Sequence, residues 1–320
     1  MHSPMVDTRP RLGHGRVGTS LPGRRRRRGP RPSHWWALLF VGPTGLGLGV
    51  FYLWPMVRTI MMSFTKAGPF GGYKFIGTAN WTHLFADPEL LNSLRNTAVY
   101  TVIALLSIPI SICIALLLNS SGLRGRSFFR SVYFVPVVTM PAAVALVWRM
   151  IYNGDYGILN QALRAVGIQG TSWLTNPSTA LIAVAVVAIW SGLGLNIVIF
   201  LAGLQGIPRS VLEAAEIDGA GPLRRVVSVT IPLLSPSIFF VSVINVIGAL
   251  QVFDLIFIMI GVNNPAMSST QTIVFLFYKA AFLTNNRGYA AAIAILLLLI
   301  ILVLTAIQFA LQKRWVHYES

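Results

Sequence analysis

Four polar side chains interrupt long apolar stretches of this sequence, at positions where a hydrogen-bonding group needs a partner. They are Asn196, Asn245, Gln251 and Asp254. Because an unpaired polar group is costly inside a membrane, we expect all four to face the interior of a helical bundle. There they either bond to neighbouring helices or line a pathway for a polar solute, and the residue types leave both interpretations open.

Residues suited to enzymatic or metal chemistry are sparse. The five histidines lie in tails and one loop without paired ligand spacing, and the single cysteine, Cys113, reads as a small packing residue, so we expect no metal site. None of the four lysines lies in a Gly-Lys-Ser/Thr phosphate loop, which places any ATP hydrolysis on another subunit. Asp254 is the only acidic residue expected well inside a span, which argues against an intramembrane enzyme or a proton-coupled carrier.

The composition assigns these residues to a membrane protein. Of the 320 residues, 55% are hydrophobic and only 11% are charged, whereas a soluble domain carries about a quarter charged residues. The segment 290–311 is apolar on all sides and exceeds the about 20 residues that a helix needs to cross a bilayer. A soluble fold is excluded.

Six apolar segments predict an all-α integral membrane protein with about six transmembrane helices. Each is long enough to cross a bilayer, and several contain proline, which membrane helices tolerate where neighbours or a polar cavity satisfy the freed backbone groups. The expected spans are 35–64, 97–119, 128–152, 179–203, 233–261 and 289–311.

The net charge of +16 is concentrated at the N-terminus. Nine of the 25 Lys and Arg residues precede Ser33, and five of them form the run at 24–28. Residues 1–33 also contain prolines and glycines but no apolar pattern to bury. We therefore expect a disordered, basic cytoplasmic tail close to anionic membrane lipid, and no nucleic-acid partner.

The remaining basic residues predict the orientation in the membrane. With both termini in the cytoplasm, 17 Lys and Arg residues fall on the cytoplasmic side and 6 on the other. Arg58 and Arg149 lie near span ends, where a long side chain reaches the interface. Since basic residues gather on the cytoplasmic side of membrane proteins, we expect both termini there.

The most informative segment, residues 203–236, connects the fourth and fifth expected spans. Ser210 and Glu213 have the spacing of a capping box, and residues 211–217 favour a short helix that ends at Gly219. The pattern therefore predicts regular structure, and not an irregular loop, between the two spans.

A second short helix is expected to follow this turn. Pro222 is placed to start it, an apolar side recurs along it, and we expect Pro232 to end it. The hairpin is expected to be exposed, and it carries apolar residues beside Arg224 and Arg225 that another molecule must shield from water. That molecule is either a partner protein or, for an amphipathic hairpin lying on the membrane, lipid.

The hairpin resembles a known family. Eight of its residues match the "EAA" loop of permeases of binding-protein-dependent ABC importers: Glu213, Ala214, Ala215, Gly219, Val229, Thr230, Ile231 and Pro232. GLQGIP at 203, FVP at 134, LNSLRNT at 91 and VFD at 252 are similar to the sugar-type branch, which includes maltose and glycerol-phosphate permeases. Where the family often carries Thr-Gly-Gly-Gly-Pro, this chain reads Gly-Val-Asn-Asn-Pro at 261–265, a departure that concerns the external loop.

This resemblance implies an ABC importer type I permease fold in a bacterial cytoplasmic membrane. Its partners would be a second permease, two ABC ATPase subunits that bind ATP and Mg, and an external solute-binding protein. The implied organisation is a first transmembrane helix and external loop at 34–89, a permease domain at 90–311 with its coupling loop at 203–236, and a C-terminal tail at 312–320. The residues implied in ATPase coupling are Glu213, Ala214, Ala215, Asp218, Gly219 and Pro232.

The resemblance also suggests what the polar groups bind. With a sugar as solute, the amides and the carboxylate would hydrogen-bond its hydroxyl groups, and Trp190 or Phe253 would stack on its apolar face. A phosphorylated polyol or an amino compound is the alternative solute. Hydrogen bonds between helices remain the alternative role for the polar residues.

Overall fold

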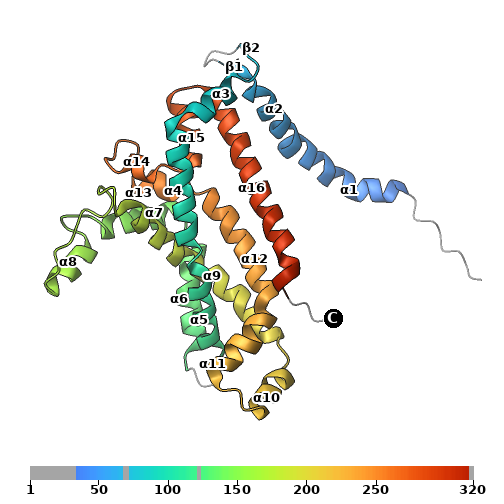
Figure 1. The fold of residues 1–320 in the computed structure, drawn as a ribbon, viewed down its shortest axis with the longest axis vertical. Coiled ribbons are helices and arrows are strands. Elements are labelled where there is room, and N and C mark those ends of the chain that lie inside the picture. The colour runs from blue at the N-terminus through green and yellow to red at the C-terminus, as the bar shows by residue number, and fades with distance from the viewer. Residues whose placement is uncertain (1–33, 68–71, 121–123, 317–320) are drawn as a thin grey trace, which may run out of the picture. The chain divides into compact units, whose positions relative to one another are not determined.

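The computed structural model describes residues 34–67, 72–120 and 124–316. The expected basic tail at 1–33 and the end of the 312–320 tail lie outside these ranges. The chain divides into two units at residues 54 and 55, and the candidate site described below lies in the second unit, Pro55–Ser320. In chain order (Figure 1), the elements are α1 (His34–Leu48), η1 (Gly49–Leu53), α2 (Trp54–Ser63), β1 (Thr65–Ala67), β2 (Tyr73–Phe75), α3 (Ala79–Ala86), α4 (Pro88–Ala104), α5 (Ser107–Asn119), α6 (Arg126–Val138), α7 (Pro141–Ile151), α8 (Ile158–Ala165), α9 (Ala180–Gly206), α10 (Arg209–Ile217), α11 (Pro222–Arg225), η2 (Val226–Thr230), α12 (Ile231–Leu250), α13 (Asp254–Met259), α14 (Met267–Thr270), α15 (Ile273–Tyr278), η3 (Lys279–Leu283) and α16 (Arg287–Trp315).

Within the described residues, five helices are long and apolar enough to cross a membrane, and a bent pair of helices makes a sixth candidate span. The expectation of about six spans in an all-α membrane protein is confirmed. Two spans nevertheless differ from their expected form. The five long helices are Leu39–Ser63, Pro88–Asn119, Ala180–Gly206, Pro222–Leu250 and Arg287–Arg314.

The expected span at 128–152 is not one continuous helix but a bent pair of half-length helices, α6 and α7. They meet at an angle of 102°. Pro141 begins α7, and the residue before it, Met140, has extended backbone with φ −58° and ψ 127°. A proline disfavours helical geometry in the residue that precedes it, which favours a break at this point.

The expected bounds of the fifth span, 233–261, are wrong at both ends. Its helix stops at Leu250, and α13 begins only at Asp254, after a short non-helical link. At its other end the helix runs back without a stop through η2 to Pro222. A further apolar helix at Ile273–Leu283, which the sequence patterns did not predict, follows α14.

Pro232 does not end the hairpin's second helix, because a wider turn accommodates it. In the π turn η2, the backbone N–H of Ile231 donates to the carbonyl of Val226, five residues earlier. Proline has no N–H, and its ring crowds the carbonyl four residues before it, so a wider turn at this point lets the helix continue. The second helix of the hairpin and the fifth span are therefore one continuous helix, Pro222–Leu250.

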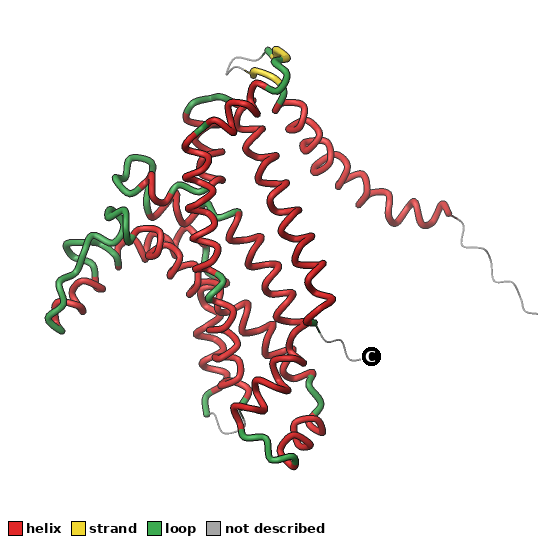
Figure 2. Tube along the Cα trace, in the orientation of Figure 1, coloured by secondary structure: helices red, strands yellow, loops and turns green. Residues whose placement is uncertain are grey.

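The long helix α9 lies at the centre of the second unit. It packs against α4, α5, α6 and α12. Gly194 allows the close approach of α6, since a Cβ there would overlap the carbonyl oxygen of Tyr133. At one end of this unit, shown at the top in Figure 2, β1 and β2 pair antiparallel with Lys66 opposite Lys74. The α10–α11 hairpin lies at the other end, here called the hairpin end.

A seam of buried polar groups joins α4 to the segment between α14 and α15. Thr97 accepts a hydrogen bond from the backbone N–H of Ile273 at 3.0 Å and donates to the carbonyl of Ser93 at 2.7 Å. The Asn96 amide donates to the carbonyl of Gln271 at 3.1 Å. The segment that follows the fifth span is thus held firmly against the second span.

Candidate functional site

The first helix of the hairpin, α10, begins two residues earlier than the capping-box spacing predicts. Its N-cap is Pro208, with extended backbone at φ −60° and ψ 132°, and no described side chain caps the helix. Ser210 therefore lies inside the first turn, and the expected Ser210–Glu213 capping box is wrong. Glu213 and Ala214 are exposed and Ala215 is partly exposed, so this face is free to contact a partner.

Backbone geometry, rather than side-chain packing, closes α10 at Gly219. Gly219 has φ +75°, a left-handed conformation that glycine adopts without strain. Its N–H donates to the carbonyl of Glu216, and the N–H of Ala220 donates to the carbonyl of Ala215, both at 3.0 Å. These two bonds define a Schellman motif with Asp218 as the C-cap, which confirms the predicted glycine turn.

The second half of the hairpin is tied to the first by one ion pair. Pro222 occupies the first turn of α11, as predicted. Arg225 lies 3.0 Å from Glu216, which is 72% exposed, so solvent screens the pair and it contributes at most about 1 kcal/mol. Pro232 is partly buried beyond the π turn and lies away from the exposed tip.

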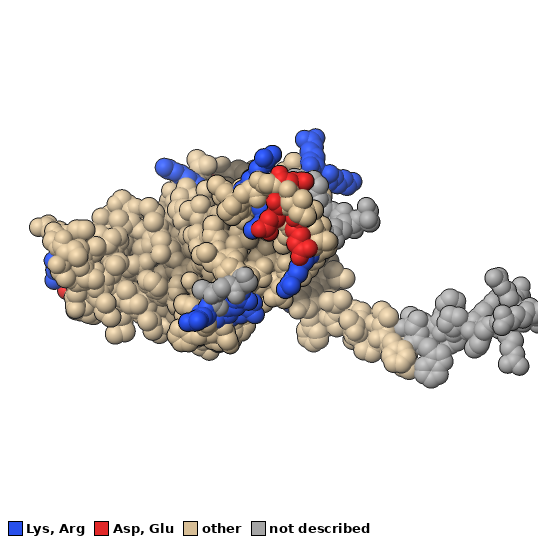
Figure 3. Space-filling model, turned by 90° about the horizontal axis from the view of Figure 1, so that it is seen from below, with Lys and Arg blue, Asp and Glu red and all other residues tan. Residues whose placement is uncertain are grey.

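The tip of the hairpin exposes large apolar side chains that have no cover within this chain's described residues. Ile217 is 87% exposed, Leu223 76% and Val227 56%. Viewed from the hairpin end, acidic side chains gather in one place with basic side chains beside them (Figure 3). The hairpin therefore offers a preformed surface with apolar residues and charges of both signs, which is suited to docking a protein.

A second feature is a cavity of about 520 Å³ between α4, α6, α7, α9 and α12. Both helix breaks lie at this cavity. Thr139 and Pro141, from the break between α6 and α7, line it together with Gln251 and Phe253, from the break between α12 and α13. Broken helices are tolerated at membrane depth where their free backbone groups line a polar cavity, and such breaks mark substrate sites in transporters.

Five of the six predicted pathway residues line this cavity: Asn196, Asn245, Gln251, Phe253 and Asp254. Trp190 does not. It is half-exposed and packs edge-on against Trp148, with ring centroids 5.5 Å apart. Trp148 in turn contacts Tyr152, so Trp190 belongs to an aromatic cluster between α7 and α9.

Asn196 and Asn245 bond to each other and to a residue that the sequence patterns did not identify. The Asn245 amide donates to the side-chain oxygen of Asn196 at 3.0 Å. Ser107 accepts from the Asn196 amide at 3.4 Å and donates to the Asn245 side-chain oxygen at 3.3 Å. The three side chains close a triangle between α5, α9 and α12 at the cavity wall. Hydrogen bonding between helices, one of the two predicted roles, is therefore observed.

Gln251 and Asp254 are better placed to meet a ligand. The expectation that they lie inside the fifth span is wrong, because Gln251 caps the end of α12 and Asp254 opens α13. Both side chains are exposed, both line the cavity, and the carboxylate of Asp254 forms no ion pair among the described residues. Phe253 lies between them and stacks on Phe257 with centroids 5.2 Å apart.

Other polar lining residues escaped the sequence analysis. Tyr100 on α4 and Ser191 on α9 also line the cavity, although neither interrupts its apolar stretch as an amide or carboxylate does. Cys113 is exposed on α5, so its expected packing role is wrong. Among the described residues, no group of three His, Cys, Asp or Glu side chains is placed to hold a metal ion.

The fold and the cavity define a multi-pass membrane protein of the transport class. The chain belongs to the family of binding-protein-dependent transport system inner membrane components, whose model matches residues 90–317. This is the family that the EAA motif indicated.

Several relatives match most of the chain. This chain is 34% identical over 275 residues to the arabinooligosaccharides transport system permease protein AraP of Bacillus subtilis. The aligned region covers 85% of this chain and 87% of AraP. It is 35% identical over 285 residues to the sn-glycerol-3-phosphate transport system permease protein UgpA of Agrobacterium fabrum, spanning 88% and 95%. It is 34% identical over 277 residues to the lactose transport system permease protein LacF of Rhizobium radiobacter, spanning 85% and 92%.

The fold is similar to that of a solved bacterial alginate ABC transporter in complex with an alginate pentasaccharide-bound periplasmic protein. The TM-score is 0.78 at 21% identity, covering 88% of this chain and 94% of that one. This likeness confirms the expected permease fold.

Proposed function

We propose that this chain is the membrane-spanning permease subunit of an ATP-driven importer for a sugar or oligosaccharide, and that its α10–α11 hairpin couples transport to ATP hydrolysis on a partner. One observation carries the proposal. The helix Pro222–Leu250 runs for 29 residues from the hairpin to the cavity wall, where Asn245 and Gly248 lie. A displacement of the hairpin is therefore transmitted to the pathway by a single element.

The exposed tip is the docking surface for an ATPase subunit. The Schellman turn holds Ile217 and Leu223 in a defined arrangement without a partner, so little ordering is needed on binding. Glu213 faces outward and is suited to pair with a basic residue of the ATPase. The small side chains of Ala214 and Ala215 allow a partner protein to approach the helix backbone closely. Asp218 and Gly219 fix the end of the helix.

The full importer requires other chains. This chain would supply part of the wall of the pathway, and a second permease would supply the rest. Two ABC ATPase subunits would bind ATP and Mg. An external solute-binding protein would deliver the solute at the end opposite the hairpin. Relatives named as permease components and the solved transporter with its periplasmic protein support this assembly.

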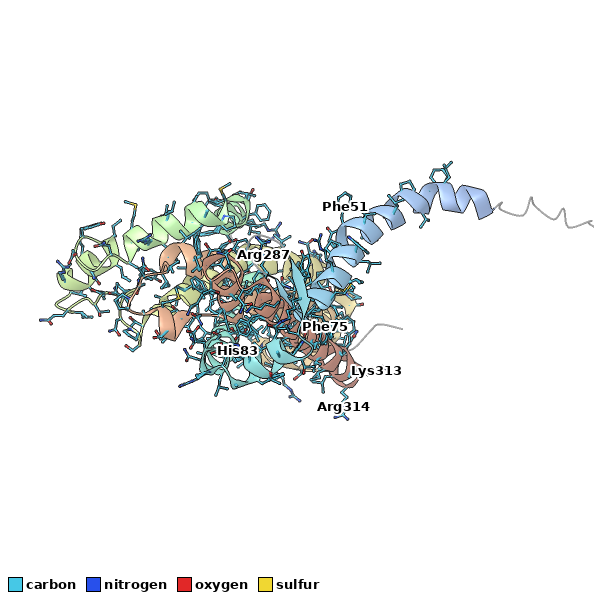
Figure 4. The ribbon with its side chains drawn as sticks, turned by 90° about the horizontal axis from the view of Figure 1, so that it is seen from above. Phe51, Phe75, His83, Arg287, Lys313 and Arg314 are labelled. Carbon is cyan, nitrogen blue, oxygen red and sulfur yellow. The ribbon has the colours of Figure 1, made fainter. Side chains whose placement is uncertain are left out.

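The hairpin end faces the cytoplasm in this proposal, since ATP is there. The last turn of α16 carries Lys313 and Arg314, which fits a cytoplasmic C-terminus under the positive-inside rule. Figure 4 views the molecule from the opposite end, where His83 and Arg287 are labelled. That face would meet the solute-binding protein.

The assembly is tested by gentle affinity purification of the chain from its native membrane, followed by mass spectrometry. The proposal expects a second permease with an EAA motif and an ATPase with a phosphate-binding loop in constant ratio to this chain. Recovery of the chain alone or as a homo-oligomer, in several mild detergents, would refute the proposal and favour a self-contained carrier.

A further inference from the structure

A second cavity, here called the outer pocket, has a volume of about 240 Å³. Its lining comes from three segments: 149–155 at the end of α7, 172–175 in the connection to α9, and 259–264 after the start of α13. Among the described residues, none lines both this pocket and the central cavity. Because α9 runs from this connection to the hairpin, the outer pocket lies at the end opposite the hairpin.

One lining residue belongs to the segment in which this chain departs from its family. Where other members often carry Thr-Gly-Gly-Gly-Pro, Asn264 takes the place of the last glycine. Its side-chain oxygen accepts a hydrogen bond of 2.8 Å from the backbone N–H of Ala266. The amide N–H groups of Asn264 have no partner among the described residues and are left for the pocket. A glycine has no side chain to offer here, so this donor is a feature of the chain and not of the family pattern.

Two more donors come from the opposite wall. The side-chain oxygen of Asn153 accepts from the backbone N–H groups of Asp155 and Tyr156, at 2.9 and 3.1 Å. Since a backbone N–H only donates, these bonds fix the amide so that its own N–H groups remain for a ligand. Arg149 donates to the carbonyl of Ile258 at 3.3 Å through one terminal nitrogen, and its other terminal nitrogen is likewise unpaired among the described residues.

The loops that form the pocket are held together without a ligand. Asn160 is 1% exposed and donates to the carbonyls of Gly154 and Thr171, at 2.8 and 2.9 Å. It also accepts from the ring N–H of Trp173 at 2.7 Å. Gly154 lets the two loops meet closely, because a Cβ there would lie 2.7 Å from the hydroxyl oxygen of Ser172. The pocket is thus preformed, and little ordering is needed on binding.

The rest of the lining combines a polar rim with an apolar floor. Asp155, Ser172 and Thr175 are exposed, and the carboxylate of Asp155 forms no ion pair among the described residues. The floor is made of three buried side chains, Tyr152, Leu174 and Met259. The outer pocket therefore offers hydrogen-bond donors, one carboxylate acceptor and an apolar surface.

This combination selects the chemistry of the ligand. A ligand with a single charge is repelled by either Arg149 or Asp155, whereas a neutral ligand is not. Hydroxyl groups donate to a carboxylate and accept from amides and a guanidinium, and the C–H face of a sugar ring suits an apolar floor. The volume is below the about 300–1,000 Å³ of pockets for drug-sized ligands, which fits one ring and not a chain of rings.

We propose that the outer pocket binds one saccharide unit, and that it serves as an extracytoplasmic subsite separate from the central cavity. Asn264, Asn153 and Arg149 donate hydrogen bonds to the sugar, and Asp155 accepts them. The role as a subsite of transport rests on the proposed importer function, whereas the binding of a saccharide in this pocket does not.

Occupancy is measured with a cysteine reporter in the purified complex, without ATP. Cys113→Ser removes the only native thiol, and Thr175→Cys places one at the exposed rim of the pocket. Its reaction with a neutral maleimide is followed in the presence of lactose and of arabinotriose, the sugars suggested by two relatives. We expect at least one of the two sugars to slow the reaction in a saturable manner. Protection by neither sugar would overturn the proposal.

A reporter elsewhere on the same protein controls for general effects of the sugars. Thr284→Cys lies at the exposed rim of another pocket, beside His83 and Lys279, and its reaction is expected to be unaffected. Equal slowing at both reporters would overturn the assignment to the outer pocket.

Asn264→Asp tests the amide donor without disturbing its loop. The aspartate keeps an oxygen for the N–H of Ala266, so the turn is preserved while the donor is lost. Leaving a hydrogen-bonding group of the bound sugar unpaired is expected to raise the half-protecting concentration about tenfold. The matched control is Asn263→Asp, which makes the same charge change at an exposed residue outside the lining and is expected to have no effect. Equal results for the two variants would refute the role of Asn264.

Two further variants separate the outer pocket from the central cavity and from a defect in one loop. Asn153→Asp preserves its own turn in the same way and is expected to weaken protection by a similar factor. A Gly248→Cys reporter in the central cavity should respond to sugar equally with and without Asn264→Asp. A parallel loss at Gly248→Cys would show that Asn264 acts on the whole protein, and would overturn the separate site.

The remaining outcomes distinguish this inference from the importer function. Protection of Thr175→Cys by a copurified, ligand-free solute-binding protein but by neither sugar would assign the pocket to protein docking and overturn the proposal. ATP-dependent uptake of lactose or arabinotriose without protection would refute the subsite and leave the importer standing. Protection by sugar in a chain that recovers no ATPase would support the saccharide site and refute the importer.

Discussion

Asn245 on α12 donates a hydrogen bond of 3.0 Å to Asn196 on α9, and Ser107 on α5 completes the triangle. Because α12 continues to the hairpin, this contact joins the coupling element to the centre of the bundle. We expect Asn196→Leu to lower stability by about 0.6 to 1.7 kcal/mol, the range found for hydrogen bonds between membrane helices. Thermal unfolding of the purified complex measures this loss.

The double variant Asn196→Leu/Asn245→Leu separates the bond from its surroundings. If the triangle is the cause, the second substitution adds less than it does alone, since its partner is already gone. Strictly additive losses would contradict the coupling between these two residues.

Gly219→Val should uncouple the hairpin without disturbing the membrane bundle. A β-branched residue is strained at φ +75°, so the Schellman turn opens and the tip loses its docked shape. ATP-dependent uptake is expected to fall at least about tenfold, which corresponds to a loss of 1.4 kcal/mol in coupling, while the amount of protein in the membrane is unchanged.

The control for this substitution lies two residues away. Gly221 has φ −61°, and no described atom lies within 4 Å of a Cβ added there. Gly221→Ala is therefore expected to retain uptake. Normal uptake by Gly219→Val would show that the turn is not needed for coupling.

Gly194→Ala should prevent correct packing of α6 on α9. The added Cβ would overlap the carbonyl oxygen of Tyr133, and backbone on both sides leaves little room to move. The expected result is reduced protein in the membrane and greater sensitivity to protease. Gly192→Ala, whose nearest described neighbour is the Asn245 side-chain oxygen at 4.0 Å, is the tolerated counterpart. Equal behaviour of the two variants would contradict this packing.

Thr97→Val should be more harmful than Glu89→Gln, although both weaken the link between α4 and the segment after the fifth span. Valine has the shape of threonine but leaves the buried N–H of Ile273 unpaired, at a cost of about 1–3 kcal/mol. The Glu89–Lys279 ion pair is exposed, so its loss costs less than about 1 kcal/mol. Thermal unfolding ranks the two variants, and the reverse order would refute this assignment.

The sequence predicted the features that depend on local chemistry. Gly219 was identified as a turn because only glycine suits a left-handed helix end, and Pro222 as a helix start because its missing N–H is not needed there. The presence of polar residues at the cavity followed from the cost of leaving Asn196 and Asn245 unpaired in lipid.

Features that depend on packing between distant segments escaped the sequence analysis. Pro136, Pro141 and Pro232 all lie in apolar segments, yet Pro141 starts a helix after a break while the helix passes through Pro232 by way of a π turn. Tertiary contacts decide between these outcomes, and the sequence pattern around each proline does not. Ser107 was missed because a serine in an apolar helix commonly bonds to its own backbone.

The coupling of the hairpin to the cavity is tested most directly by measuring access to the cavity in two nucleotide states. A cysteine reporter, Gly248→Cys in a Cys113→Ser background, is reacted with a membrane-impermeant thiol reagent added at the face opposite the hairpin. The reaction is run without nucleotide and with ATP and vanadate, which trap the ATPase with ADP after hydrolysis. We predict that trapping changes the reaction rate at least about tenfold and that Gly219→Val abolishes this change. Equal rates in both nucleotide states, in a complex that retains its ATPase subunits, would contradict the account.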